Sequence, residues 1–189
     1  MTSESSQTYK CRYCEKSFRK ESSLAVHLCE PKRRWQQEKE TGVQLGLKAY
    51  LRFYEVTQGS AKLKSYEDFV KSPYYNAFVK FGSYCADINA INISRYSDWL
   101  LKNKVKLDQW THDSNYTKYL VEYLREEDAF DAISRSVATT GDLAEYEGIQ
   151  CKDVLRYGSK NKICHCITNG KISPWLLYQS DSGKEFLDS

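Results

Sequence analysis

The hydrophobic positions of this chain follow a helical spacing over most of its length. After residue 41, apolar residues recur at intervals of three and four, and the clearest run is Val43, Leu47, Tyr50, Leu51 and Tyr54. These intervals place apolar side chains on one face of a helix. Beyond the start of the chain, no stretch alternates convincingly with a period of two. We therefore expect a mainly α protein whose main domain is all-helical and built of short helices.

Residues that favour the first positions of a helix mark the expected boundaries. The expected caps are Ser65 with Asp68, Ser72 with Pro73, Ser94, Asp113, and Ser173 with Pro174. The helix after Asp113 should run over 113–126, and further short helices are expected over 127–137, 141–147, 151–157 and 159–168. Gly42 and Gly46 should loosen the start of the first long helix, so we expect a break near Thr41.

The start of the chain carries the spacing of metal ligands. Cys11 and Cys14 are separated by two residues, and twelve residues lie between Cys14 and His27. Phe18 and Leu24 are placed to form a small apolar core around the metal. With an aromatic residue before Cys11, this stretch resembles the Cys2His2 zinc-finger family. The resemblance implies a small ββα finger that binds one Zn²⁺ ion.

The fourth ligand departs from that family, which places a second histidine about three to five residues after the first. Here the candidate is Cys29, only two positions after His27. Side chains at i and i+2 of a helix point about 200° apart, so both cannot ligate from an intact helix. The helix should end near His27, and Pro31 supports an end there. We predict a Cys3His site of Cys11, Cys14, His27 and Cys29; the alternative is a degenerate finger that buries these cysteines without metal.

These patterns divide the chain into successive parts. The zinc finger with its basic exit covers 1–34, and a linker or helix start covers 35–45. The helical domain covers 46–189 and could form two lobes, a basic one over 46–110 and an acidic one over 111–189. A chain of 189 residues is long enough to bury a real core beyond the finger.

The composition narrows the class of protein. Hydrophobic residues make up 41% of the chain, with only three Pro and nine Gly, which argues against disorder. No apolar run approaches the roughly 20 residues of a membrane span, and the first ten residues are polar rather than signal-like. Seven cysteines are an odd number, and zinc uses those at the front, so a reducing compartment fits best. We expect the cytoplasm, or the host cytoplasm if the protein is viral, and no membrane partner.

Charge is distributed unevenly along the chain. Residues 1–40 carry nine Lys or Arg against six acids, and residues 41–106 carry ten against five. Residues 107–189 reverse the balance, with nine against fourteen. The basic N-terminal part is expected to bind a polyanion, and the acidic C-terminal part is expected to bind a protein. Alternatively, two solvated faces of one domain would give the same counts.

The basic residues of the finger are candidates for nucleic-acid binding. In the family's helix numbering, base-facing positions fall on Lys20, Ser23 and Val26, and of these Lys20 alone offers a strong guanine contact. Binding should therefore depend on phosphate contacts rather than on base reading. The candidate cations are Arg12, Lys16, Arg19, Lys20, Lys32, Arg33 and Arg34, with a second tract of Arg52, Lys62, Lys64, Lys71 and Lys80. The aromatic residues interleaved with the second tract are expected to be mostly core.

The remaining cysteines and a nearby histidine do not predict a second metal site. They are Cys151, Cys164, His165 and Cys166. They contain no Cys-x-x-Cys unit, and free thiols are commonly buried, so we expect packing roles without metal. The sequence also lacks a phosphate-binding glycine loop, a His-Glu-x-x-His unit and a nucleophile elbow. We expect no catalytic activity and no small-molecule substrate.

From Gly46 onward, the order of features resembles the helicase-loading proteins of large tailed phages, which are all-helical and two-lobed. The resemblance rests on the segment 48–51, on Tyr74 and Tyr75 with 78–85, and on 163–177 followed by 186–188. That family carries no N-terminal zinc finger. The resemblance implies a viral replication protein that binds forked or single-stranded DNA and recruits a helicase or a single-strand-binding protein.

These observations favour a non-catalytic, zinc-finger accessory protein of phage DNA replication that binds DNA or RNA through phosphates. The alternative is a transcription regulator or a protein–protein interaction module whose finger docks on protein.

Overall fold

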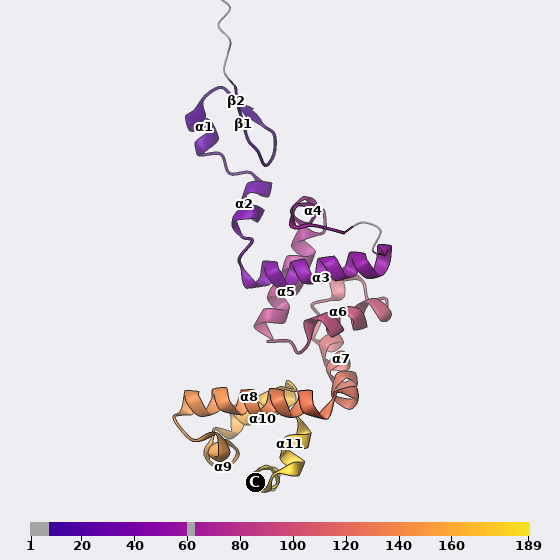
Figure 1. The fold of residues 1–189 in the computed structure, drawn as a ribbon, viewed down its shortest axis with the longest axis vertical. Coiled ribbons are helices and arrows are strands. Elements are labelled where there is room, and N and C mark those ends of the chain that lie inside the picture. Colours follow the sequence, from indigo (N-terminus) through magenta and orange to yellow (C-terminus); the bar gives the residue numbers. More distant parts are fainter. Residues whose placement is uncertain (1–7, 60–62) are drawn as a thin grey trace, which may run out of the picture. The chain divides into compact units, whose positions relative to one another are not determined.

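The computed structural model describes residues 8–59 and 63–189, and this part of the chain is mainly helical (Figure 1). Its elements are twelve α-helices, two short 3-10 helices and one two-stranded antiparallel sheet near the start. The predicted class, mainly α with a small ββα unit at the front, is confirmed. The chain divides into two compact units between Thr111 and His112.

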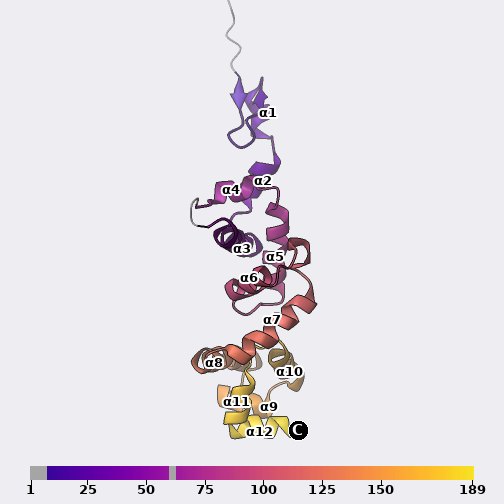
Figure 2. The same cartoon turned by 90° about the vertical axis from the view of Figure 1, so that its right-hand side faces the viewer.

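The first unit contains the finger and a helical body. The finger consists of β1 (Tyr9–Lys10), β2 (Ser17–Phe18) and α1 (Glu21–Ala25), and α2 (Glu30–Gln36) follows it. The body consists of α3 (Thr41–Gln58), α4 (Tyr66–Lys71), α5 (Tyr75–Asp87), α6 (Ile93–Lys102) and the 3-10 helix η1 (Leu107–Gln109). In both views of Figures 1 and 2, α5 crosses beside α3.

Three glycines let α3 and α5 cross at close range. A β-carbon on Gly46 would stand 2.5 Å from the carbonyl oxygen of Phe78, and one on Gly82 would clash with backbone atoms of Gly42 and Gly46. Glycine is therefore required here for close packing. The sequence reading of Gly42 and Gly46 as residues that only loosen the helix start missed this role, although α3 does begin at Thr41.

The core of the first unit is aromatic. Its fully buried aromatic side chains are Phe69, Phe78, Phe81, Tyr96 and Trp110. The Trp110 ring lies 5.1 Å from that of Phe81 and 5.8 Å from that of Phe78, in edge-on arrangements that aromatic pairs prefer. Tyr50 and Tyr75 are buried as well, whereas Tyr74 is exposed. Of the rings in the second basic tract, Tyr50, Phe69 and Tyr75 are thus buried, and Phe53, Tyr54 and Tyr66 are partly buried.

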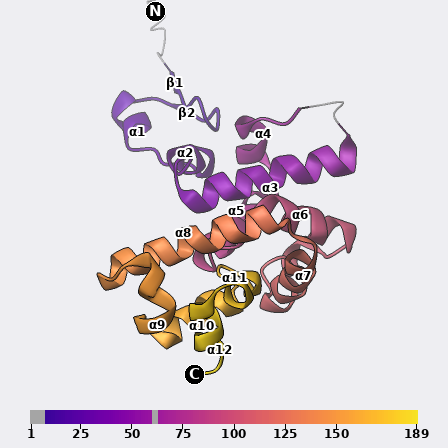
Figure 3. The same ribbon diagram turned by 60° about the horizontal axis from the view of Figure 1, so that its bottom comes forward.

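The second unit is built around one long helix. Its elements are α7 (Asp113–Glu126), α8 (Ala129–Glu147), η2 (Cys151–Asp153), α9 (Val154–Tyr157), α10 (Lys160–Thr168), α11 (Pro174–Gln179) and α12 (Asp181–Leu187). Figure 3 shows α9 to α12 gathered along one side of α8. Their shared core contains Ala144 of α8 together with Val154, Ile163, Ile172 and Leu177.

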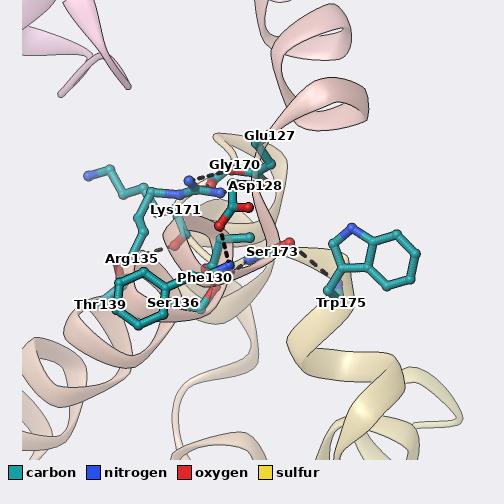
Figure 4. A network of polar contacts seen from close by, with 11 residues as sticks. Glu127, Asp128, Phe130, Arg135, Ser136, Thr139, Gly170, Lys171, Ser173 and Trp175 are labelled. Carbon is teal, nitrogen blue, oxygen red and sulfur yellow. Dashed lines mark hydrogen bonds and ion pairs between the residues drawn. The ribbon is translucent and has the colours of Figure 1, made fainter.

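A polar network joins the start of α8 to the loop before α11 (Figure 4). Arg135 donates two hydrogen bonds to the Glu127 carboxylate, at 2.6 and 2.9 Å, and a third at 2.8 Å to the carbonyl of Gly170. The Glu127 side chain is only 1% exposed and that of Arg135 18%. Nearby, the N–H of Ser173 donates to the hydroxyl of the buried Ser136 at 2.8 Å. These hydrogen bonds satisfy buried polar groups, which would destabilise the fold if burial left them without partners.

Several predicted helix starts are confirmed. Ser65 and Asp68 form a reciprocal capping box at the start of α4. Ser173 caps α11 with Pro174 at its first position, and α10 begins directly after Ser159. The helix predicted over 113–126 is present with those bounds.

Other predicted starts are wrong. The Ser72 hydroxyl accepts a hydrogen bond from the N–H of Tyr74, so Ser72 closes a turn and α5 begins only at Tyr75. Asn92, not Ser94, caps α6, with its side-chain oxygen accepting from Arg95. Asn tolerates the left-handed backbone, φ 45°, found at that position.

Two further expectations need correction in the second unit. His112 occupies the cap position of α7, and Asp113 lies in the first turn instead. The separate helices predicted over 127–137 and 141–147 are one continuous helix, α8. Gly141 lies inside α8, because a single glycine weakens a helix without ending it.

Candidate metal centre

Four predicted ligands come together in the finger. The ligand atoms of Cys11, Cys14, His27 and Cys29 all lie within 4.8 Å of one another. The Sγ atoms of Cys11 and Cys29 are 3.9 Å apart, and the Sγ of Cys14 is 3.2 Å from Nε2 of His27. Tetrahedral zinc with Zn–S bonds of about 2.3 Å requires sulfur atoms about 3.8 Å apart. The described residues thus contain a Cys3His group that could hold a single zinc ion.

The two strands position the first two cysteines. Tyr9 pairs with Phe18 across the sheet, and the turn between the strands carries Cys11 and Cys14. The N–H of Glu15 donates to the carbonyl of Cys11 at 2.8 Å, and Glu15 adopts the left-handed backbone, φ 61°. This tight turn points both sulfur atoms to the same side.

The local hydrogen bonds also act on the thiols. The backbone N–H groups of Cys14 and then of Tyr13 lower the pKa of the Cys11 thiol, because they donate to its sulfur. Loss of solvent raises the pKa of the Cys29 thiol. A bound cation would favour the thiolate form of every cysteine ligand, since the thiolate is the form that binds metal.

The predicted helix break between the last two ligands is confirmed. Helix α1 ends at Ala25, residues 27–29 are not helical, and α2 begins at Glu30 with Cys29 as its cap residue. His27 and Cys29 can therefore face one point, which a continuous helix would forbid. Pro31 plays a different part from the one expected, because it lies in the first turn of α2 and opens that helix.

The Phe18 ring supports the histidine. Its centroid lies 4.7 Å from that of the His27 ring, and both side chains are partly buried. Leu24 is partly buried as well. The short α1 leaves the finger a small helix of five residues, with Lys20 before it, Ser23 inside it and Val26 after it. The three positions expected to face bases are therefore not presented by a full recognition helix.

Two of the candidate cations are committed to internal contacts. Arg52 donates to both carboxylate oxygens of Asp98, at 2.6 and 3.0 Å, and also to Glu55. Arg34 donates to the carbonyl of Val70 at 2.6 Å, and its guanidinium lies 4.4 Å from the centre of the Tyr75 ring. Both guanidinium groups are therefore largely engaged by contacts within the fold and are less available to phosphates. The sequence did not reveal these contacts.

The other candidate cations have fewer internal partners. Arg33 pairs with Glu30, Lys32 donates to the carbonyl of His27, and Lys64 lies over the ring of Tyr54. Arg12 contacts Tyr13 and Lys16 approaches the face of Phe18. Arg19 and Lys20 are exposed and form no ion pair within the described residues. Lys62 lies outside the described residues.

A groove beside the finger contains residues that the sequence reading did not select. Tyr13 of the finger and Trp35 of α2 lie with ring centroids 6.5 Å apart. With Arg12, Pro31 and Lys71 among its lining residues, the groove has a volume of about 500 Å³. No spacing rule could have selected Trp35, because its ring contacts both Tyr13 of the finger and Tyr66 of α4, and these contacts exist only in the folded chain.

The cysteines and histidine outside the finger lie in separate surroundings. Cys151, Cys164 and His165 are exposed, whereas Cys85 and Cys166 are buried. Burial raises the pKa of Cys85 to about 12. Within residues 8–59 and 63–189, the finger ligands form the one group of Cys, His, Asp or Glu side chains close enough to share a metal ion.

None of the described helices has both the length and the apolar character that crossing a bilayer requires. Comparisons of the chain with protein-family models, with curated proteins and with solved structures gave no match.

Proposed function

We propose that the chain binds one Zn²⁺ ion through Cys11, Cys14, His27 and Cys29, and that the zinc-stabilised finger binds the phosphate backbone of nucleic acid. The observation that carries the proposal is the convergence of the four ligand atoms within 4.8 Å. A metal at this point would tie the strands, α1 and the start of α2 together, a structural role typical of four-coordinate zinc.

The exposed cations of the finger support binding to phosphates. Arg19 and Lys20 project from the segment between β2 and α1, and Arg12 and Lys16 flank the turn that carries Cys14. Phosphate contacts by Lys and Arg provide affinity without base information. Base reading is disfavoured because α1 spans five residues and Val26, an apolar side chain, is 83% exposed after it.

The proposed role is scaffolding without catalysis, with forked or single-stranded DNA as the favoured ligand. The narrower role implied by the resemblance to phage helicase loaders, delivery of a helicase to a replication fork, depends on a preference for forks. The groove with Tyr13 and Trp35 supports single strands, since partly exposed rings beside a cation such as Arg12 can stack on unpaired bases.

The test is a titration of labelled single-stranded, duplex and forked DNA, and of single-stranded RNA, with zinc-loaded protein at several salt concentrations. Phosphate binding predicts affinity that falls steeply as salt rises. Removal of zinc by a chelator should weaken binding. The double variant R19E/K20E should lower the affinity for every DNA sequence by a similar factor.

A matched control is K152E/K160E, which makes the same change in net charge at two exposed lysines of the second unit. It should bind like the wild type if the finger carries the contact. Equal losses in both variants would point to bulk charge instead. Affinity that is absent, or that does not change with salt, would contradict the proposal and favour a finger that docks on protein.

A further inference from the structure

Helix α8 carries apolar side chains on two faces, and the other elements of the second unit cover only one of them. The buried face presents Ala132, Ser136, Thr140 and Ala144, spaced four residues apart. The exposed face presents Phe130, Ile133 and Val137, which are 76%, 44% and 51% exposed. Spacings of three and four put these three side chains on one stripe. We call Phe130, Ile133, Val137 and Gly141 the α8 stripe.

Gly141 lies on the same side of α8 as the other three stripe residues, but it contributes no side chain there. A β-carbon at Gly141 would meet nothing within 4 Å, in contrast to Gly46 and Gly82, where neighbouring backbone fills the space. A mid-helix glycine costs roughly 1 kcal/mol relative to alanine. Since nothing in the described structure packs against Gly141, the internal fold does not require glycine there. Close approach of a helix from another molecule would use it.

The charges beside the stripe are acidic. Asp131, Asp142 and Glu145 are exposed and lie along one edge of it, because spacings of 11 and 14 residues return to nearly the same side of a helix. The one cation of α8, Arg135, is bound to Glu127 and to the carbonyl of Gly170. The α8 surface therefore offers apolar side chains with a negative edge and no free positive charge of its own.

We propose that the α8 stripe is the docking site for a basic amphipathic helix of a partner protein. Such a helix would place its apolar face on Phe130, Ile133 and Val137, and its Lys or Arg residues beside Asp131 and Asp142. A second copy of this chain fits less well, because an antiparallel pair of α8 helices would put the two acidic edges on the same side. This inference is independent of the zinc and nucleic-acid proposal.

The test uses the full zinc-loaded chain and two labelled helical peptides of about 18 residues, the length of α8. One peptide has a Leu/Lys amphipathic pattern, and the other replaces every Lys by Glu. Fluorescence anisotropy should give saturable binding of the Leu/Lys peptide and little binding of the Leu/Glu peptide. The variants F130S/V137S and D131N/D142N should each weaken Leu/Lys binding by about tenfold or more.

The matched control is V121S/L187S, which removes two exposed apolar side chains of α7 and α12. It should bind the Leu/Lys peptide like the wild type, and circular dichroism should show that all variants remain folded. The proposal is wrong if the Leu/Lys peptide fails to bind, if the Leu/Glu peptide binds equally well, or if the stripe variants bind unchanged. It is also wrong if sedimentation shows that the wild type dimerises through the stripe and that F130S/V137S abolishes the dimer.

Discussion

Gly46 of α3 lies so close to Phe78 of α5 that a β-carbon on the glycine would stand 2.5 Å from the phenylalanine's carbonyl oxygen. The contact is with backbone, which cannot turn away as a side chain can. The two helices therefore hold each other at a distance that only glycine permits, and the aromatic core of the first unit is built on this crossing.

Replacing Gly46 by Ala should destabilise the first unit by about 1–3 kcal/mol or more, because the added methyl group forces the helices apart. Urea denaturation followed by circular dichroism with zinc present would measure the change in midpoint. Gly141→Ala is the control, since open space surrounds that position inside α8. It should stabilise the protein by about 0.5–1 kcal/mol. A harmless Gly46→Ala would mean that the crossing is looser than described.

The buried ion pair of Glu127 and Arg135 should contribute more to the free energy of unfolding than the exposed pair of Arg156 and Glu185. Glu127→Gln leaves the largely buried Arg135 without its counter-charge, and we expect a loss of about 2–3 kcal/mol in the stability of the second unit. Both partners of the other pair are exposed, so Glu185→Gln should change stability very little. Thermal unfolding of both variants would show which ion pair contributes more to stability. Equal losses of stability in the two variants would contradict the prediction.

The exposed pair also has a defined pH dependence. Hydrogen bonds from Arg156 lower the pKa of Glu185 in the folded protein. The small contribution of this pair is therefore fully present above the unfolded pKa of Glu, about 4.3, and is lost as the pH falls through the lower folded value. Comparing wild type and Glu185→Gln from neutral pH downward should show their difference shrinking toward the acid end.

The seven cysteines should react with an alkylating reagent in three groups. In zinc-loaded native protein, the exposed Cys151 and Cys164 should react first. Chelation should add the three finger cysteines, because metal no longer protects them. Cys85 should react only on unfolding, since burial raises its pKa to about 12 and closes access. The buried Cys166 should behave likewise. Mass spectrometry of the alkylated peptides assigns each site, and early labelling of Cys29 in zinc-loaded protein would contradict the Cys3His ligand set.

Cys29 is the candidate ligand that departs from the Cys2His2 pattern. Its replacement should lower the affinity for zinc without unfolding the helical body. Cys29→Ser should weaken zinc affinity by more than about 100-fold, since even residues that only support a ligand cost 10–100-fold. Cobalt substitution, read by the absorption of thiolate-bound Co²⁺, and competition with a chelator would measure this. Cys151→Ser should bind zinc normally. The helical signal of the body should persist in both variants, because its aromatic core does not include the ligands.

Local patterns were sufficient for the helical class and for the ligand set. The i, i+3 and i+4 spacing of Val43, Leu47 and Tyr50 predicts α3, and ligand spacing from Cys11 to Cys29 predicts the four atoms that converge. The break between His27 and Cys29 followed from helix geometry alone. Each of these depends on residues close together in the sequence, where bond geometry limits the choices.

The tertiary structure decided which residues are free to act. The sequence predicts that Arg34 and Arg52 are phosphate-binding cations. In the folded chain, however, Arg34 contacts Val70 and Tyr75, and Arg52 binds Asp98. Gly46 serves close packing while Gly141, in the same kind of helical setting, faces open space. The sequence by itself determined the helical class and the candidate metal ligands, because those follow from neighbours along the chain. Only the folded chain decided which charges, rings and glycines face solvent, because that depends on contacts between residues far apart in the sequence.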